Sequence, residues 1–124
     1  MSQSVRDFEK SLEAGESLEG KEFYIGQLDA TGKLEVGEGA TDLIVGVIQA
    51  GAPAGSPATY RHTGTTKVIA GGSISIGDFV TTDNAGKAVA TTTDGDVVIG
   101  RALEAADAND IFEVQLGIHR IYIA

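Results

Sequence analysis

Residues 15–22, GESLEGKE, have the spacing closest to that of a known chemical motif. They match the first seven positions of the phosphate-binding loop GxxxxGK[ST], whose last residue binds Mg²⁺. The eighth position is Glu22 in place of Ser or Thr, and Glu16 and Glu19 would repel an anion. A phosphate-binding loop also follows a strand and begins a helix, whereas here a helical pattern precedes and a strand pattern follows. The segment therefore does not predict nucleotide binding.

Other polar residues also lack the partners that chemistry needs. Residues 94–96, Asp-Gly-Asp, resemble part of a calcium loop but lack its further acidic ligands, and Asp-Gly is common in turns. His62 and His119 have neither metal-ligand nor triad spacing, which favours surface or interface roles. Ser73 and Ser75 are not in a GxSxG motif. We therefore expect no catalytic residue, cofactor, metal site or small-molecule substrate, and no enzymatic activity.

Composition excludes further classes of function. The formal net charge of -9 repels a phosphate backbone, and no stripe of Lys and Arg offsets it, so we expect no nucleic-acid partner. Cysteine is absent, which excludes disulfides and thiolate metal sites and suits assembly in a reducing compartment. No apolar run has the roughly 20 residues of a membrane span, and the N-terminus has no apolar signal region. The sequence therefore predicts a soluble protein without a membrane partner.

The elements that would position any site are short strands. A chain of 124 residues with 17 glycines, few aromatics and no Trp must build one core from small and β-branched side chains. Alternating or continuous apolar runs, separated by Gly and Asp turns, occur at residues 21–28, 34–36, 43–48, 68–83, 97–99 and 111–124. We predict an all-β fold, a compact small β-barrel or β-sandwich, with residues 20–124 as a single domain.

The two halves of the chain repeat one pattern. Residues 42–46, DLIVG, match residues 96–100, DVVIG. Gly32-Lys33 also matches Gly86-Lys87, and Gly32 is as far from Gly46 along the chain as Gly86 is from Gly100. Residues 25–28, IGQL, also match residues 76–79, IGDF, if three residues are inserted near Val80. A duplicated strand-turn-strand unit is the simplest interpretation, although ordinary turn chemistry produces weaker patterns of this kind.

The N-terminal residues 1–19 are expected to form a short helix or an arm. Val5, Phe8 and Leu12 have helical spacing, Ser4 is suited to cap a helix, and Gly15 is suited to end it. A helix this short is unstable alone in water, so it must dock on another surface or fray. We predict that Phe8 and Leu12 make subunit contacts.

Two more segments are candidates for contact. Residues 50–62 contain Pro53 and Pro57 and little bulky apolar surface, which predicts a loop that either binds a partner or only connects strands. At the C-terminus the inward face of the strand from residue 111 carries Phe112, and beyond His119 the pattern reverses. Ile121 and Ile123 would then be exposed unless another chain covers them, which indicates self-association.

The chain resembles the small capsid decoration, or cement, proteins of tailed bacteriophages. The most specific segments are AGG-x5-GD at residues 70–78 and IG-x-ALEAA at residues 99–106, and the similarity covers roughly residues 45–116. Homologues of these proteins are sometimes labelled RecA/RadA-type recombinases, but the failed phosphate-loop match gives that label no support.

The resemblance implies a structural protein of the virion. Such a protein is made in the host cytoplasm, forms a homotrimer and binds the outer capsid surface, where it bridges subunits of the major capsid protein. On this interpretation Phe8, Leu12, Pro53 and Pro57 contact the capsid or neighbouring copies. The alternative is another virion β module of a minor head, tail or fibre-associated protein.

Overall fold

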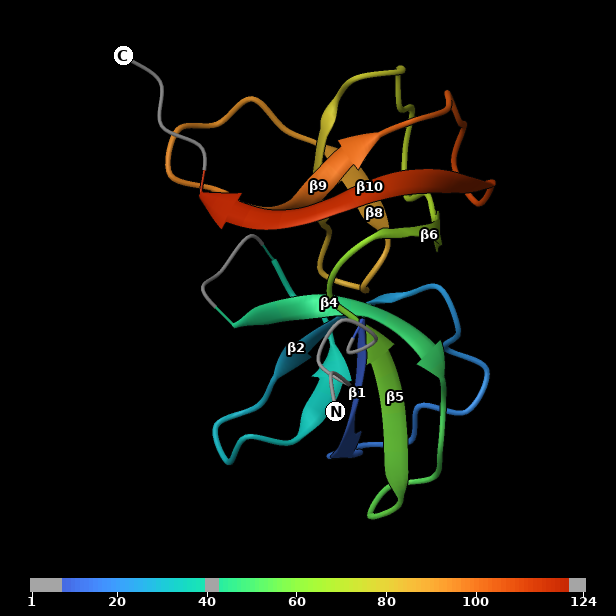
Figure 1. Ribbon diagram of the computed structural model, residues 1–124, viewed down its shortest axis with the longest axis vertical. Helices are drawn as coiled ribbons and strands as arrows, with labels where there is room; N and C mark the ends of the chain where they lie inside the picture. Colours follow the sequence, from blue (N-terminus) through green and yellow to red (C-terminus); the bar gives the residue numbers. More distant parts are fainter. Residues whose placement is uncertain (1–7, 40–42, 121–124) are drawn as a thin grey trace, which may run out of the picture.

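The computed structural model describes residues 8–39 and 43–120, which contain ten strands and no helix. The strands form two five-stranded antiparallel sheets, which occupy the two halves of the elongated molecule in Figure 1. The first sheet contains β1 (Glu9–Glu13), β2 (Ile25–Leu28), β3 (Leu34–Val36), β4 (Ile44–Ala50) and β5 (Pro57–Arg61). The second contains β6 (Thr65–Ile69), β7 (Phe79–Thr82), β8 (Ala88–Ala90), β9 (Val97–Ala102) and β10 (Ile111–Arg120). The all-β prediction is confirmed.

The two sheets have the same topology, which confirms the duplication. Their strand orders are β1-β5-β4-β2-β3 and β6-β10-β9-β7-β8, so each strand of the first sheet corresponds to the strand five places later. The registers also agree, since Leu12 pairs with Ala58 as Val68 pairs with Phe112.

The sheets are strongly curled but are not closed barrels. Within each sheet, the two edge strands meet at one parallel bridge, Ala14 with Leu34 in the first and Ala70 with Ala88 in the second. The arrangement of two packed sheets is sandwich-like, so of the two predicted architectures the sandwich is the closer description.

One part of the predicted repeat alignment is wrong by three residues. The pairs Gly26–Val36 and Val80–Ala90 are equivalent, so Ile25–Leu28 corresponds to Phe79–Thr82 and not to residues 76–79. The two halves instead differ by two residues at a turn that contains Gly20, whose φ is +76°. The two Ile-Gly pairs are not equivalent, because Gly26 lies within β2 whereas Gly77 lies in the turn before β7 with φ +90°.

The helical interpretation of the N-terminal segment is wrong where the structure describes it. Glu9–Glu13 form β1, which pairs along its whole length with β5. The apolar spacing of Phe8 and Leu12 fits a strand as well, because residues an even number apart share one strand face. Pairing with β5 satisfies backbone groups that a short isolated helix could not hold against water. Val5 and Ser4 lie outside the described residues, and the division at residue 19 stays a prediction.

The predicted loop at residues 50–62 is also partly a strand. Residues 51–56 are irregular, but Pro57–Arg61 form β5. Pro57 is the first residue of that strand, a position where the missing N–H costs least. The prediction of a loop was therefore wrong for residues 57–61, because a proline can begin a strand.

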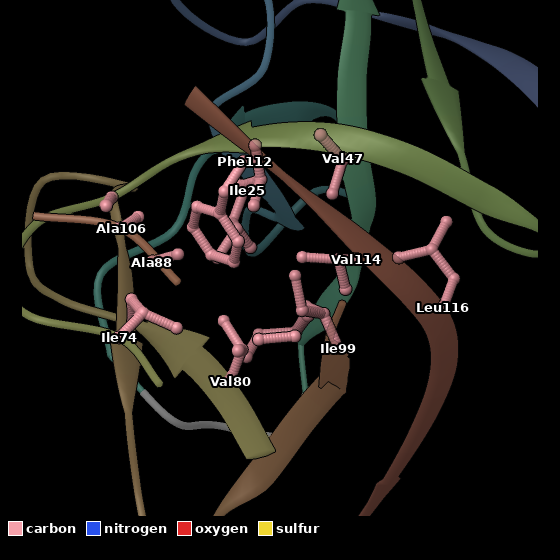
Figure 2. Packing of buried hydrophobic residues seen from close by; sticks show 14 of the residues in the cluster. Ile25, Val47, Ile74, Val80, Ala88, Ile99, Ala106, Phe112, Val114 and Leu116 are labelled. Carbon is pink, nitrogen blue, oxygen red and sulfur yellow. The ribbon is translucent and has the colours of Figure 1, made fainter. Parts of the chain in front are cut away.

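Two clusters of buried apolar side chains form the hydrophobic core. The first sheet curls around Leu18, Leu34, Ile48, Ala58 and neighbouring residues, with Leu12 and Tyr24 packed at its margin. The second sheet surrounds a larger cluster that includes Phe112, Val114 and Ile99. Figure 2 shows Ile25 and Val47 of the first sheet among these residues, so the two sheets share this core.

Candidate functional site

The segment that nearly matches a phosphate-binding loop has a structural role in this fold. The N–H of Gly15 donates to the carbonyl of Leu34 at 2.8 Å, and the N–H of Leu18 donates to that of Ala52 at the same distance. Leu18 is fully buried in the first cluster. The chain then enters β2, so no helix follows the loop to direct its N–H groups at an anion.

The other polar candidates also lie in turns or at strand ends. Asp94 and Gly95 form a turn with Gly95 at φ +91°, as the sequence indicated. His62 lies against Tyr60, whereas the Nδ1 of His119 is 2.7 Å from the carbonyl of Gly117 in the other sheet. In the described part of the chain, no three His, Cys, Asp or Glu side chains are grouped to hold a metal ion. Among these same residues no helix is long and apolar enough to span a bilayer.

The predicted contact residues of the N-terminal half lie along the β1–β5 ribbon. Leu12 pairs with Ala58, next to Pro57, and its side chain is half-buried against the first cluster. Phe8 lies just before the opposite end of β1, where its carbonyl accepts a hydrogen bond of 2.9 Å from the N–H of His62. Its side chain is 44% exposed. The structure therefore places Leu12 beside Pro57 but Phe8 apart from both.

The loop before β5 presents an exposed tip. Pro53 and Pro57 are exposed, while the N–H of Gly55 donates to the carbonyl of Ala14 and anchors the loop to the end of β1. The anchor gives the exposed tip a defined shape. Ile121 and Ile123 lie outside the described residues, so their predicted contacts stay a prediction.

An open pocket of about 330 Å³ lies on the second sheet and is lined by residues of β7, β9 and β10. Its side chains form a stack, in which the Arg101 guanidinium lies 4.7 Å from the centre of the Phe79 ring and His119 meets that ring edge-on at 5.5 Å. Gly100 and Gly117 form part of its wall. The pocket combines an aromatic surface with a cation, which suits protein contact.

Sequence analysis did not select this pocket or the exposed apolar residues near it. Leu103 is 41% exposed and Ile111 is 52% exposed, both on or beside strands of the second sheet, and Ile76 before β7 is 72% exposed. Their apolar character predicted burial. Only the correct repeat alignment, which pairs Phe79 with Ile25, could have indicated that the second sheet differs from the first sheet at these positions.

Matching turns stiffen both sheets. The Asp29 carboxylate accepts hydrogen bonds from the N–H groups of Thr31 and Lys33 and from the Thr31 hydroxyl, at 2.8–2.9 Å. These bonds, with that from the Lys33 N–H the most important, lower the pKa of the Asp29 carboxyl. Asp83 accepts the equivalent bonds from Ala85 and Lys87. Such turns give the surface a fixed shape without catalytic geometry.

Comparison with known proteins identifies the relatives of this architecture. The family model of the phage cement protein matches residues 20–118. No curated protein sequence matches the chain. Among solved structures, the N base of the head fiber gp8.5 of bacteriophage phi29 has a TM-score of 0.65 at 18% identity, covering 93% of this chain and 98% of that one. At that identity the likeness shows a shared fold. The match over residues 20–118 shows that the chain belongs to the phage cement protein family.

Proposed function

We propose that the protein is a cement of the phage capsid that binds the outer surface of the head as a homotrimer and bridges subunits of the major capsid protein. The observation that carries this proposal is the family match over residues 20–118. This family has a structural role in the virion, and the homotrimer, the outer-surface location and the bridged capsid subunits are proposed in addition.

Features of the molecule support such a role. A trimer presents three copies of each contact, so modest individual contacts combine through high effective concentration. The net charge of -9 keeps free copies soluble and gives them no affinity for packaged DNA. The anchored turns and loop tips give each contact a fixed shape, which lowers the entropy lost on binding.

The test uses purified mature heads that lack decoration. Added protein is expected to bind at threefold or quasi-threefold positions in cryo-electron microscopy, with hundreds of copies per head, and to raise the temperature at which heads release DNA. Absence of density on the head exterior, together with unchanged heat resistance, would contradict the proposal.

The same assay tests the predicted N-terminal contact. Deleting residues 1–19 would also remove the buried Ala14 and Leu18, so loss of binding could reflect unfolding. The exposed Phe8 permits the substitution Phe8→Asp, which is expected to lower head occupancy at least about tenfold if a partner buries the ring. The matched control is Ala30→Asp in the exposed β2–β3 turn. Equal occupancy of the two variants would remove Phe8 from the contact surface.

A second candidate function is supported by the structural likeness to a head fiber base. The protein would then be a fibre-associated or other minor head or tail module. Copy number distinguishes the two functions, because a cement occupies hundreds of equivalent positions and a tail component only a handful.

The predicted role of Ile121 and Ile123 in self-association has its own test, in which both residues are replaced with Asp. Unchanged sedimentation of the free protein would show that they do not support self-association.

A further inference from the structure

Within residues 8–39 and 43–120, the two repeated units meet through a shared core. Ile25, Ile44 and Val47 project from the first sheet into the core cluster of the second. Ile25 and Val47 are a cross-strand pair of β2 and β4, both fully buried, and β4 lies against β9 and β10. Beside them the Gln49 amide donates to the Thr66 hydroxyl at 2.9 Å. One face of the first sheet thus closes the core of the second (Figure 2).

The corresponding face of the second sheet is open at part of its surface. The cross-strand pair Phe79–Arg101 is equivalent to Ile25–Val47, and it lines the 330 Å³ pocket instead of being buried. Gln49 corresponds to Leu103, which is 41% exposed. Ile44 corresponds to Val98, which is already buried. We call Phe79, Arg101 and Leu103 the outer face.

The core that such a face would cover is incomplete in the first sheet. Val68, Val97 and Ile99 of the second sheet are 0%, 6% and 0% exposed in the cluster that Ile25 and Val47 close.

Their counterparts in the first sheet are Leu12, Leu43 and Val45. Leu12 and Val45 are only half-buried, and Leu43 is 44% exposed. We call these three residues the open mouth. The first sheet therefore has a counterpart of the receiving half of the internal interface, and the second sheet has a counterpart of the covering half, and both are partly exposed.

We infer that the outer face of one copy covers the open mouth of a second copy, so that copies join head to tail through a contact that repeats the internal one. The inference rests on the proposed homotrimer and names the surfaces that form it. A cyclic trimer requires contacts between two different surfaces of each subunit, and a chain with two complementary open surfaces provides them.

The residues of the outer face suit a contact that forms after folding. The internal interface can use Val47 because it is never exposed, whereas Arg101 at the same position keeps the free chain soluble. Arg101 also stacks on Phe79, and aromatic and Arg side chains are enriched in protein interfaces. Leu103 and Leu43 supply exposed apolar surface on the two sides of the proposed contact.

The test places one negative charge on each surface of the full-length protein. Leu103→Asp alters the outer face and Leu43→Asp alters the open mouth, both at exposed positions where folding should be preserved. Each variant is expected to weaken self-association at least about tenfold, because a carboxylate would be buried in an apolar contact. Ala30→Asp, an exposed turn position on neither surface, should assemble like the unaltered chain. Sedimentation velocity and native mass spectrometry measure the species.

Mixing the two variants separates this contact from a symmetric one. The Leu43→Asp copy retains its outer face and the Leu103→Asp copy retains its open mouth, so an equal mixture should form heterodimers with one intact junction and nothing larger. Dimer formation also shows that both variants are folded. A mixture that stays monomeric, variants that assemble like Ala30→Asp, or an unaltered chain that is monomeric at all concentrations and on heads would overturn the inference.

Failure of this inference can be told apart from failure of the proposed function. If the unaltered chain occupies heads but neither substitution changes its assembly, the cement function stands and the contact is elsewhere. If the chain assembles through these surfaces but does not bind heads, the contact stands and the cement function fails.

Discussion

At Gly46 and Gly100 the backbone of each sheet leaves no room for a side chain. A Cβ atom on Gly100 would lie 1.9 Å from the carbonyl oxygen of Gln115, and one on Gly46 would lie 2.2 Å from that of Arg61. Their φ angles of +154° and +157° are also ones that other residues rarely adopt. The repeat therefore preserves a steric requirement at the strand β4 and β9 positions, because a backbone neighbour cannot move aside as a side chain could.

Replacing Gly100 with Ala is expected to lower the free energy of unfolding by about 3 kcal/mol or more, because the clash involves backbone. Gly72→Ala is the control, since no atom lies within 4 Å of its Cβ position, and the change there should stay within about 1 kcal/mol. Urea unfolding followed by circular dichroism measures both. Similar midpoints for the two variants would show that the strands can shift to admit the methyl group.

At the scale of the element, β4 contributes to both clusters from opposite faces, and β2 contributes Ile25 to the core of the second sheet. Ile25 and Val47 point into the core of the second sheet, and Ile48 packs inside the first. The N–H of Ile25 also donates to the carbonyl of Gly86 at 2.8 Å, which joins a turn of the second unit to a strand of the first. The two sheets should therefore unfold as one cooperative unit.

The substitution Ile25→Ala is expected to cost about 2–5 kcal/mol, because it leaves a cavity in the shared core. Two of the three tyrosines, Tyr24 and Tyr60, pack in or against the first cluster, so tyrosine fluorescence reports mainly on the first sheet, whereas far-ultraviolet circular dichroism reports on both sheets. The two signals should give one coincident urea transition in the unaltered chain. Ile76→Ala, at a side chain 72% exposed, is the control. Two separate transitions would contradict the shared core.

Strands with strong local sequence signals could be predicted. Strands whose formation depends on pairing with a neighbouring strand could not. Glycine turns and continuous apolar runs located β4 and β9 closely, and alternation located β10. β1 was missed because its apolar spacing fits a helix or a strand, and only the edge of β5 selects the strand.

The candidate contact surfaces were predicted less well than the strands. Phe8 and Pro53 are exposed, as a contact role needs, but the pocket at Phe79 and Arg101 depends on strands that register brings together. Single residues do not encode that juxtaposition, so no local pattern could have located it.

The whole molecule combines a net negative charge with several exposed apolar side chains. The net charge of -9 opposes contact between copies, while residues such as Leu43 and Leu103 favour it. The Debye length falls from about 10 Å at 0.1 M salt to about 3 Å at 1 M, so added salt screens the repulsion and leaves apolar contact intact.

We therefore expect self-association to strengthen several-fold as sodium chloride is raised across that range, with sedimentation equilibrium as the measurement. Ala30→Asp, which adds a negative charge away from both surfaces, should follow the same trend as the unaltered chain. The opposite result, in which salt dissociates the assembly, would mean that ion pairs hold the copies together. In that case Arg101 would act through its charge, and the apolar match between outer face and open mouth would not be the source of affinity.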